Sequence, residues 1–218
     1  MKFLLSAILF FISTNLYTQN INLEWTKSIG GLGNSGAIDA SGNVYTTGSF
    51  AGTVDFDPGS GVSNLTSSGS NDIFIQKLDA NGNFIWVKQL GGISNDAGYS
   101  ITTDASGNVY ITGYFSLNLG GGISSNGGYD IFIAKLDSNG NIVWIKSMGG
   151  TSSDYGESIT TDASGNVYTT GFFYNTVDFN PGSGVSNLVS NGGYDIFIQK
   201  LDANGNFLWA KSMGGTSY

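Results

Sequence analysis

Short runs of β-branched and aromatic residues alternate with turn sequences along almost the whole chain after residue 20. In one repeat unit these runs cover residues 99–104, 108–115, 130–137 and 141–148, lengths that are typical of strands. The run from Asp130 to Leu136 is apolar over most of its length, which predicts a strand covered on both faces. The pattern predicts an all-β protein in which four strands make one unit.

Two turn sequences join the predicted strands, and each occurs three times. D-A-S-G-N-V-Y begins at Asp39, Asp104 and Asp162, and D-x-N-G-N begins at Asp79, Asp137 and Asp202. In each turn the Asp carboxylate can accept a backbone hydrogen bond, and the Gly supplies the positive φ of a tight hairpin with a bulge. We therefore expect hairpins. A weak calcium site is the alternative, although a calcium loop needs alternating ligands and a closing Glu, and these runs turn apolar after the Asn.

The spacing of the tryptophans indicates stacked units. Trp25, Trp86, Trp144 and Trp209 lie 61, 58 and 65 residues apart. A period of this length in a β sequence favours propeller blades. We predict three four-stranded antiparallel blades, at about residues 32–92, 93–150 and 151–215, and an N-terminal outer strand at Trp25 that would complete a last blade. We expect large side chains to fill the space between blades, among them Tyr110, Phe132 and Trp144.

The units are not identical. Units one and three carry an insert, residues 53–65 and 176–188, whose alternating and P-G-S-G sequences predict a small extra hairpin. Only eight residues separate Gly31 from Asp39, where twelve separate Gly92 from Asp104, so we predict a shortened first strand around Ala37 in unit one.

Three blades are fewer than the four to eight of closed propellers, so we expect an incomplete propeller. The favoured explanation is that the chain is part of a longer protein. The alternatives are a ring completed by several chains, or an open arc whose exposed sheet edges invite self-association.

The composition excludes several kinds of chemistry. All 8 basic residues are Lys and the chain has no Arg, His or Cys, which removes Ser-His-Asp and Cys-His arrangements and zinc sites with nitrogen or sulfur ligands. The net charge of −8 argues against nucleic acid and anionic membranes as partners. We expect no catalytic residues, no cofactor and no metal site. The 34 Gly with only 2 Pro suit many tight turns.

The first 19 residues have the pattern of a secretory signal peptide. Lys2 precedes an apolar run from Phe3 to Ile12, and polar residues follow from Ser13. The run is too short to span a bilayer comfortably, so we expect cleavage near residues 18–20 and no membrane insertion afterwards. An uncleaved anchor helix is the alternative. The mature protein, residues 20–218, is then expected to be secreted or at the cell surface, with the periplasm as a further option.

We expect both kinds of turn on one rim of the blades, and the inserts and Gly-Gly connectors on the opposite rim. Variable loops adapt to ligands better than uniform turns do, so we predict that a ligand meets the insert rim. The candidate contacts are Asp55, Asp57 and Asp178 from the inserts, and Asp96, Tyr99, Asp154, Tyr155 and Glu157 from the connectors. Glu157 stands out because Tyr99 takes its place in the preceding unit.

The repeats resemble a known family. The series D-x-x-G-N-V-Y-x-T-G-x-F, D-I-F-I-x-K-L-D-x-N-G-N and W-x-K-x-x-G-G is similar to SBBP repeats, the β-propeller repeats of secreted and cell-surface bacterial proteins. The V-D-F-D-P-G insert is similar to Bacteroidetes-type forms. The resemblance covers residues 21–218 and implies a propeller fold, but it implies little about activity.

Together these features predict a secreted or cell-surface, non-catalytic β-propeller module that binds a protein or a glycan through loops on one rim. One alternative is a carboxylate-dependent glycan-active enzyme, with Asp55 and Asp57 as the nearest carboxylate pair. The other alternative is a structural spacer within a larger adhesin.

Overall fold

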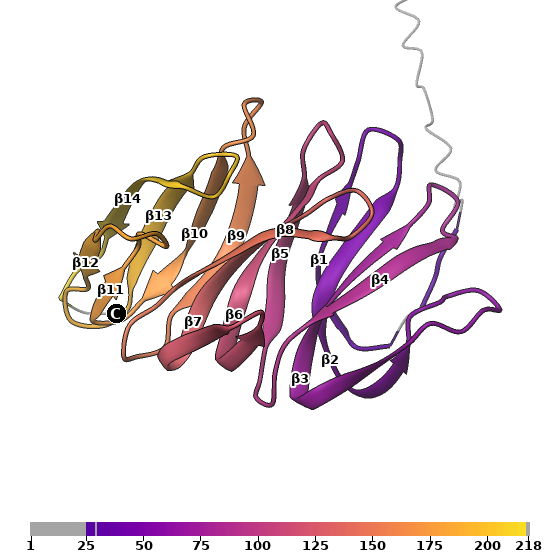
Figure 1. Ribbon diagram of the computed structural model, residues 1–218, viewed down its shortest axis with the longest axis horizontal. Helices are drawn as coiled ribbons and strands as arrows, with labels where there is room; N and C mark the ends of the chain where they lie inside the picture. Colours follow the sequence, from indigo (N-terminus) through magenta and orange to yellow (C-terminus); the bar gives the residue numbers. More distant parts are fainter. Residues whose placement is uncertain (1–24, 29, 217–218) are drawn as a thin grey trace, which may run out of the picture.

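The computed structural model describes residues 25–28 and 30–216, which contain strands, turns and loops. Three four-stranded antiparallel sheets stand side by side as blades, and a two-stranded hairpin extends the third blade (Figure 1). The sheets do not close into a ring, so the prediction of an all-β, incomplete propeller is confirmed. No helix in this described part has the length and apolar character needed to cross a membrane. The predicted signal peptide lies outside the described residues.

Each blade is an antiparallel sheet whose strands follow one another in the chain, except that blade three has an extra hairpin between its second and third strands. Blade one contains β1 (Leu32–Ile38), β2 (Val44–Asp55), β3 (Asn64–Leu78) and β4 (Phe84–Leu90). Blade two contains β5 (Ala97–Thr103), β6 (Val109–Gly120), β7 (Ile123–Leu136) and β8 (Ile142–Met148). Blade three contains β9 (Tyr155–Thr161), β10 (Val167–Phe173), β13 (Asp195–Leu201) and β14 (Phe207–Met213), with the hairpin of β11 (Thr176–Asp178) and β12 (Asn187–Val189) between its second and third strands.

The repeated turn sequences form the predicted hairpins. In the turn that starts at Asp104, the backbone N–H of Gly107 donates to Asp104 O over 3.0 Å, and Gly107 has a φ of 76°. Asp104 Oδ1 accepts from the N–H groups of Ser106 and Asn108, both over 2.9 Å, while Oδ2 accepts from Asn108 Nδ2 and the Tyr110 hydroxyl. Both oxygens of the carboxylate therefore organise the turn itself.

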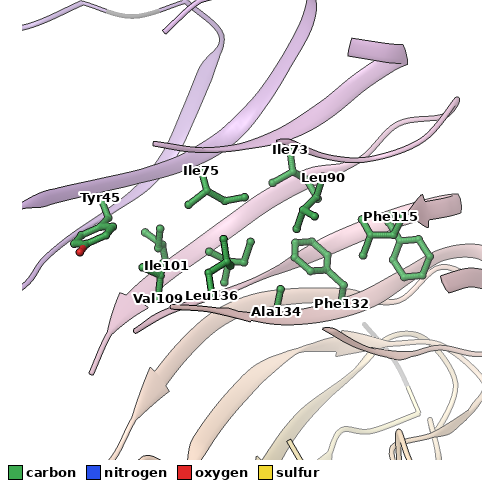
Figure 2. Close-up of a cluster of buried hydrophobic side chains, with 12 residues drawn as sticks. Tyr45, Ile73, Ile75, Leu90, Ile101, Val109, Phe115, Phe132, Ala134 and Leu136 are labelled. Atoms are coloured by element: carbon green, nitrogen blue, oxygen red, sulfur yellow. The ribbon is translucent and has the colours of Figure 1, made fainter. Parts of the chain in front are cut away.

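Apolar layers between neighbouring blades form most of the core. Tyr45, Ile73 and Ile75 of blade one pack against residues of blade two such as Val109 and Phe132 (Figure 2). A second layer joins blades two and three and includes Tyr110, with Trp144 packed against it. The predicted roles of Tyr110, Phe132 and Trp144 are confirmed. The strand at Asp130 is also covered on both faces as expected, because residues 130–134 are buried.

The inserts form hairpins, as predicted. In blade one the insert lengthens β2 and β3, where Thr53 pairs with Thr66 and Asp55 with Asn64. In blade three it forms β11 and β12, where Thr176 pairs with Val189.

The prediction of a shortened first strand in blade one is wrong. The strand β1 has 7 residues, the same length as β5 and β9. The missing length comes from the connector instead. β1 begins one residue after Gly31, whereas β5 begins only at Ala97, after a loop that follows Gly91 and Gly92. The deletion in blade one therefore lies in the connector and not in the strand.

Trp25 makes the same contact with blade one that Trp86 and Trp144 make with the blades that follow them. Residues 25–28 form no strand, in contrast to the predicted outer strand. The Trp25 indole N–H nevertheless donates to Ala80 O over 3.0 Å, as the Trp86 and Trp144 indoles donate to Ser138 O and Ala203 O on the following blade. Trp25 therefore lies on blade one where the outer-strand Trp of a preceding blade would lie.

Candidate binding surface

The two rims of the blades differ in the way that the sequence predicts. Repeated turns lie next to one another on one rim, where residues 103–106 of blade two and 161–165 of blade three line a common hollow. On the other rim the connectors meet the inserts and their equivalents. There a side chain added at Gly92 would collide with Asn118 O, and one added at Gly150 would collide with Thr176 O. We call the first side the turn rim and this second side the connector rim.

Each first strand contains a bulge in a G-x-S sequence. The pairing of β1 with β2 skips Asn34, that of β5 with β6 skips Tyr99, and that of β9 with β10 skips Glu157. A bulge adds one residue to a strand and redirects its side chain. The three blades therefore present an amide, a phenol and a carboxylate at one equivalent position.

Aromatic side chains form a continuous band beside these bulges. Tyr114 is the centre, with its ring 5.2 Å from that of Tyr99, 4.6 Å from Tyr129 and 5.4 Å from Tyr155. From Tyr155 the band continues in blade three through Phe172, Tyr194 and Tyr174. The rings are partly exposed, and Tyr174 and Tyr194 each keep 36% of their surface accessible. We call these seven residues the tyrosine band.

Glu157 brings a carboxylate to the band. The side chain of Glu157 is exposed to solvent, but partial desolvation by its neighbours raises its pKa above the usual value. Burial also raises the pKa of Tyr99, and the negative charge of Glu157 adds to that rise, so the two groups lie close enough to interact. The pKa of Tyr114 is raised to about 12, first by burial and then by the neighbouring phenols. The hydroxyl groups of Tyr99 and Tyr114 are therefore neutral near pH 7 and lie beside one acid.

The structure divides the predicted contact residues into three groups. Tyr99, Tyr155 and Glu157 come together in and beside the tyrosine band. Asp96 and Asp154 are fully buried, so no ligand reaches their carboxylates in this conformation. Asp96 accepts from the N–H groups of Gly92 and Ser116, and Asp154 accepts from those of Gly150 and Tyr174. These two carboxylates hold the connectors, and the one at 154 thereby places Tyr155.

The three insert aspartates organise their own loops. Asp55 Oδ1 accepts from the N–H groups of Asp57 and Ser63 over 3.0 and 2.8 Å. Asp57 Oδ1 accepts from the N–H of Gly59, and Asp178 Oδ1 accepts from those of Asn180 and Ser186. The Ser63 and Asp57 N–H groups lower the pKa of Asp55. Each of the three carboxylates is therefore engaged within its own insert loop.

Five residues of the band were missed in the sequence: Tyr114, Tyr129, Phe172, Tyr174 and Tyr194. A signal for them exists, because each marks a place where the repeats differ. Strand pairing makes Tyr114 equivalent to Ser49 and Phe172, and Tyr129 equivalent to Asn71 and Tyr194. These five positions lie outside the motifs that the repeats share.

Comparison with known proteins supports the repeat assignment. The model of the SBBP family, described as a β-propeller repeat, matches residues 85–114 and 143–171. An uncharacterized WD repeat-containing protein L264 of Acanthamoeba polyphaga mimivirus is 27% identical over 87% of this chain, and the match covers 16% of that protein. The regulatory protein FlaEY of Caulobacter vibrioides is 24% identical over 57% of this chain and is covered over 14% of its length. The chain therefore spans less than a fifth of either relative.

One solved structure was also similar over much of the chain. A protein of unknown function from Bacteroides caccae aligns with 83% of this chain and 81% of its own, at 10% identity and a TM-score of 0.30.

Proposed function

We propose that this chain, which carries SBBP β-propeller repeats, is a non-catalytic binding module that takes a neutral glycan on its tyrosine band. The supporting observation is that seven aromatic residues and one carboxylate gather where the repeats differ. Aromatic faces pack against the C–H faces of sugars, while phenol hydroxyls and Glu157 can exchange hydrogen bonds with sugar hydroxyls. The net charge of −8 disfavours acidic glycans.

A protein segment is the second candidate ligand. Tyrosines such as Tyr174 and Tyr194 extend the band across the open surface of blade three, and tyrosine is enriched at protein interfaces. A flat aromatic surface of this kind also suits a peptide. We favour the glycan because the band combines stacking surfaces with hydroxyl and carboxylate groups.

Binding is favoured over cleavage by the state of the carboxylates. A glycosidase needs two carboxyl groups, one of them a general acid whose pKa is raised. Asp55 and Asp57 are hydrogen-bonded to their own loop, and the pKa of Asp55 is lowered by Ser63 and Asp57 N–H groups. The raised pKa of Glu157 has partial desolvation as its cause, with no contribution from a second carboxylate.

We also propose that the module works outside the cytoplasm. This rests on the leader pattern of residues 2–12 in the sequence. Expression with residues 1–19 fused to a reporter lacking its own signal tests this part separately. Export of the reporter would support it, and retention in the cytoplasm would contradict it.

The glycan proposal is tested on a printed array of neutral oligosaccharides. We expect the protein to bind a subset, Tyr155→Ser to weaken that binding about tenfold or more, and Tyr155→Phe to keep most of it. Val62→Ser, at an exposed insert position away from the band, is the matched control. Thermal melting of each variant checks that the fold is intact. Absence of binding to any oligosaccharide would contradict the proposal and favour the spacer function, and equal binding by Tyr155→Ser would contradict the site.

A further inference from the structure

The outer side of blade three repeats the surface by which blades one and two each hold the next blade. Its residues are equivalent to those of the buried layers, but no blade covers them among the described residues. Ile196 is 53% exposed and Met213 51%, whereas their counterparts in blade two, Ile131 and Met148, are 0% and 2% exposed. We call this surface the outer face of blade three; it consists of Tyr168, Ile196, Ile198, Trp209 and Met213.

The polar contacts between blades repeat as well. At the first junction, Trp86 Nε1 and Lys77 Nζ both donate to Ser138 O, over 3.2 and 3.3 Å. At the second junction, Trp144 Nε1 and Lys135 Nζ both donate to Ala203 O, over 3.4 and 3.3 Å. The equivalents on blade three are Trp209 and Lys200, and within residues 25–28 and 30–216 neither meets such a carbonyl.

A serine links the first strands of neighbouring blades. The N–H of Ile101 donates to Ser35 Oγ over 3.3 Å, and the N–H of Ile159 donates to Ser100 Oγ over 3.2 Å. Ser158 is the next serine in this series. Its expected partner is the N–H of a first strand on a following blade, at the position that Gly36 occupies in β1.

Blade one carries the complementary surface. The carbonyl equivalent to Ser138 O and Ala203 O is Ala80 O, which accepts from the Trp25 indole. Beside it lies a hollow of about 440 Å³, lined by Trp25 and by blade-one residues that include Gly33, Val44 and Leu78. A side chain added at Gly82 would approach the Trp25 ring, as additions at Gly140 and Gly205 would approach Trp86 and Trp144. Blade one is therefore built to receive a tryptophan from a neighbouring blade. We call this surface the receiving face of blade one.

A glycine at each junction confirms the match. A side chain at Gly98 would collide with Thr47 Oγ1 of the preceding blade, and one at Gly156 would collide with Thr112 Oγ1. The equivalent glycine of blade one, Gly33, has nothing within 4 Å of an added Cβ. The equivalent threonine of blade three is Thr170. The two surfaces of a further junction between blades are therefore both present in the chain. They lie at opposite ends of the row of blades (Figure 1).

We propose that the outer face of blade three docks on the receiving face of blade one in a second copy of this chain. Trp209 of one copy takes the place of Trp25 on the other, and Lys200 and Ser158 gain partners near Ala80 and Gly36. The two faces are different surfaces, so the contact is head-to-tail and generates a ring or a filament. Trp25 competes with the docking copy for Ala80 O, which makes the N-terminal segment a brake on assembly.

An engineered disulfide tests the docking geometry directly. An ideal Cβ at Gly98 lies 3.4 Å from Thr47 Cβ, close to the separation of about 3.5–4.5 Å in disulfides, and the chain has no cysteine of its own. Full-length Gly33→Cys is mixed with full-length Thr170→Cys, both in a Trp25→Ala background, and oxidised mildly. We expect a disulfide-linked dimer containing one copy of each variant. Gly33→Cys mixed with Ser164→Cys, on the turn rim, is the control pair. A yield no greater than that of the control pair would overturn the proposal.

Light scattering on variants without cysteine gives an independent readout. Trp25→Ala should raise the average mass at a given concentration, and adding Gly33→Val should return it to the monomer value. Because an added side chain at Gly33 meets nothing in the monomer, the melting temperature of this variant should change little. Association that Gly33→Val leaves unchanged would have another cause, such as the apolar run of residues 3–12, and would contradict the proposal.

Discussion

The two rims of the blades use aspartate in opposite ways. On the turn rim, six aspartates in equivalent turns hold the same backbone hydrogen bonds, and their pKa values all lie below the usual value of 3.8. On the connector rim, buried aspartates lie in pairs between blades. There burial, with the charge of Asp154, raises the pKa of Asp130 to about 7, and burial, with the charge of Asp72, raises that of Asp96 to about 6.

This difference shows on which rim the sequences of the three blades vary. The turn rim repeats because every blade needs the same hairpins. The connector rim differs from blade to blade at the bulge residues Asn34, Tyr99 and Glu157 and along the tyrosine band. Positions that change while the surrounding fold repeats are under no shared structural demand, so they are available for recognition.

The largest effect on stability is expected from the turn rim. Asp104→Ala removes the acceptor of four hydrogen bonds and leaves the hydroxyl of buried Tyr110 without its partner. We expect a loss of about 2–4 kcal/mol in the free energy of unfolding, measured by urea titration. Asp57→Ala removes the acceptor of the hydrogen bond from Gly59 in an insert loop and should cost about 1 kcal/mol or less. Equal losses in the two variants would contradict the contrast between the rims.

The two rims should give stability opposite dependences on pH. Carboxylates with a lowered folded pKa stabilise above the unfolded value of 3.8, and this contribution is lost as pH falls through their folded pKa values. Groups with a raised pKa stabilise most below the unfolded value, and this contribution is lost as pH rises towards 6 for Asp96 and 7 for Asp130. We expect the melting temperature to peak near pH 4–5 and to fall by several degrees at pH 8.

A single substitution tests whether the buried aspartates of the connector rim cause the loss of stability as pH rises. Asp130→Asn keeps the shape of the side chain but removes its titration. At one pKa unit per about 1.4 kcal/mol, the shift of Asp130 sets an upper limit of about 4 kcal/mol on the stability it loses towards neutral pH. We expect the variant to lose less stability than the wild type between pH 5 and 8. An unchanged slope would show that general charge repulsion causes the decline.

A smaller loss is expected from the turn glycines. Gly107 has a φ of 76°, and a Cβ there would meet Ser138 Cβ at an ordinary 3.6 Å. Gly107→Ala should therefore cost about 1–2 kcal/mol through backbone strain alone. Gly33→Ala, without a positive φ or a close neighbour, is the control and should leave stability within about 0.5 kcal/mol of the wild type. A loss at Gly33 as large as that at Gly107 would contradict the assignment of the cost to φ.

The smallest stability effect is expected at the proposed binding position. Glu157 is exposed and belongs to a bulge, so Glu157→Gln should change the free energy of unfolding by less than about 0.5 kcal/mol. Chemical denaturation at pH 7 checks this value. A destabilisation of about 2 kcal/mol or more would be as large as that expected for the loss of a buried polar group. It would indicate that this carboxylate has a structural role.

The sequence predicted the parts of the fold that depend on local pattern. The hairpin turns follow from Asp and Gly at fixed spacing, and the buried character of the strand at Asp130 follows from its unbroken apolar run. The first strand of blade one was predicted wrongly because the short distance from Gly31 to Asp39 was assigned to the strand, and Gly33 and Gly36 within β1 give no strand signal. Its place in the sheet depends on pairing with β2, which local propensity does not report.

The candidate site was only partly predictable for a similar reason. Tyr99, Tyr155 and Glu157 were predicted because they lie in or beside the connectors, and Glu157 also because Tyr99 takes its place in the preceding unit. Tyr114 and Tyr129 lie within strands, where aromatic residues are expected in the core, and only the pairing of β6 with β5 and β7 places them beside the bulge. Asp96 and Asp154 are buried because backbone N–H groups from other segments of the chain bind their carboxylates. Only the folded structure brings those segments close to the two aspartates.

The most direct test of the account is a comparison of one carboxylate from each rim on the same array of neutral oligosaccharides. Glu157→Gln changes the connector rim, and Asp137→Asn changes an exposed turn on the opposite rim. The account predicts that Glu157→Gln weakens binding to every oligosaccharide that the wild type recognises, while Asp137→Asn binds as the wild type does. Loss of binding in Asp137→Asn alone, or equal loss in both folded variants, would contradict it.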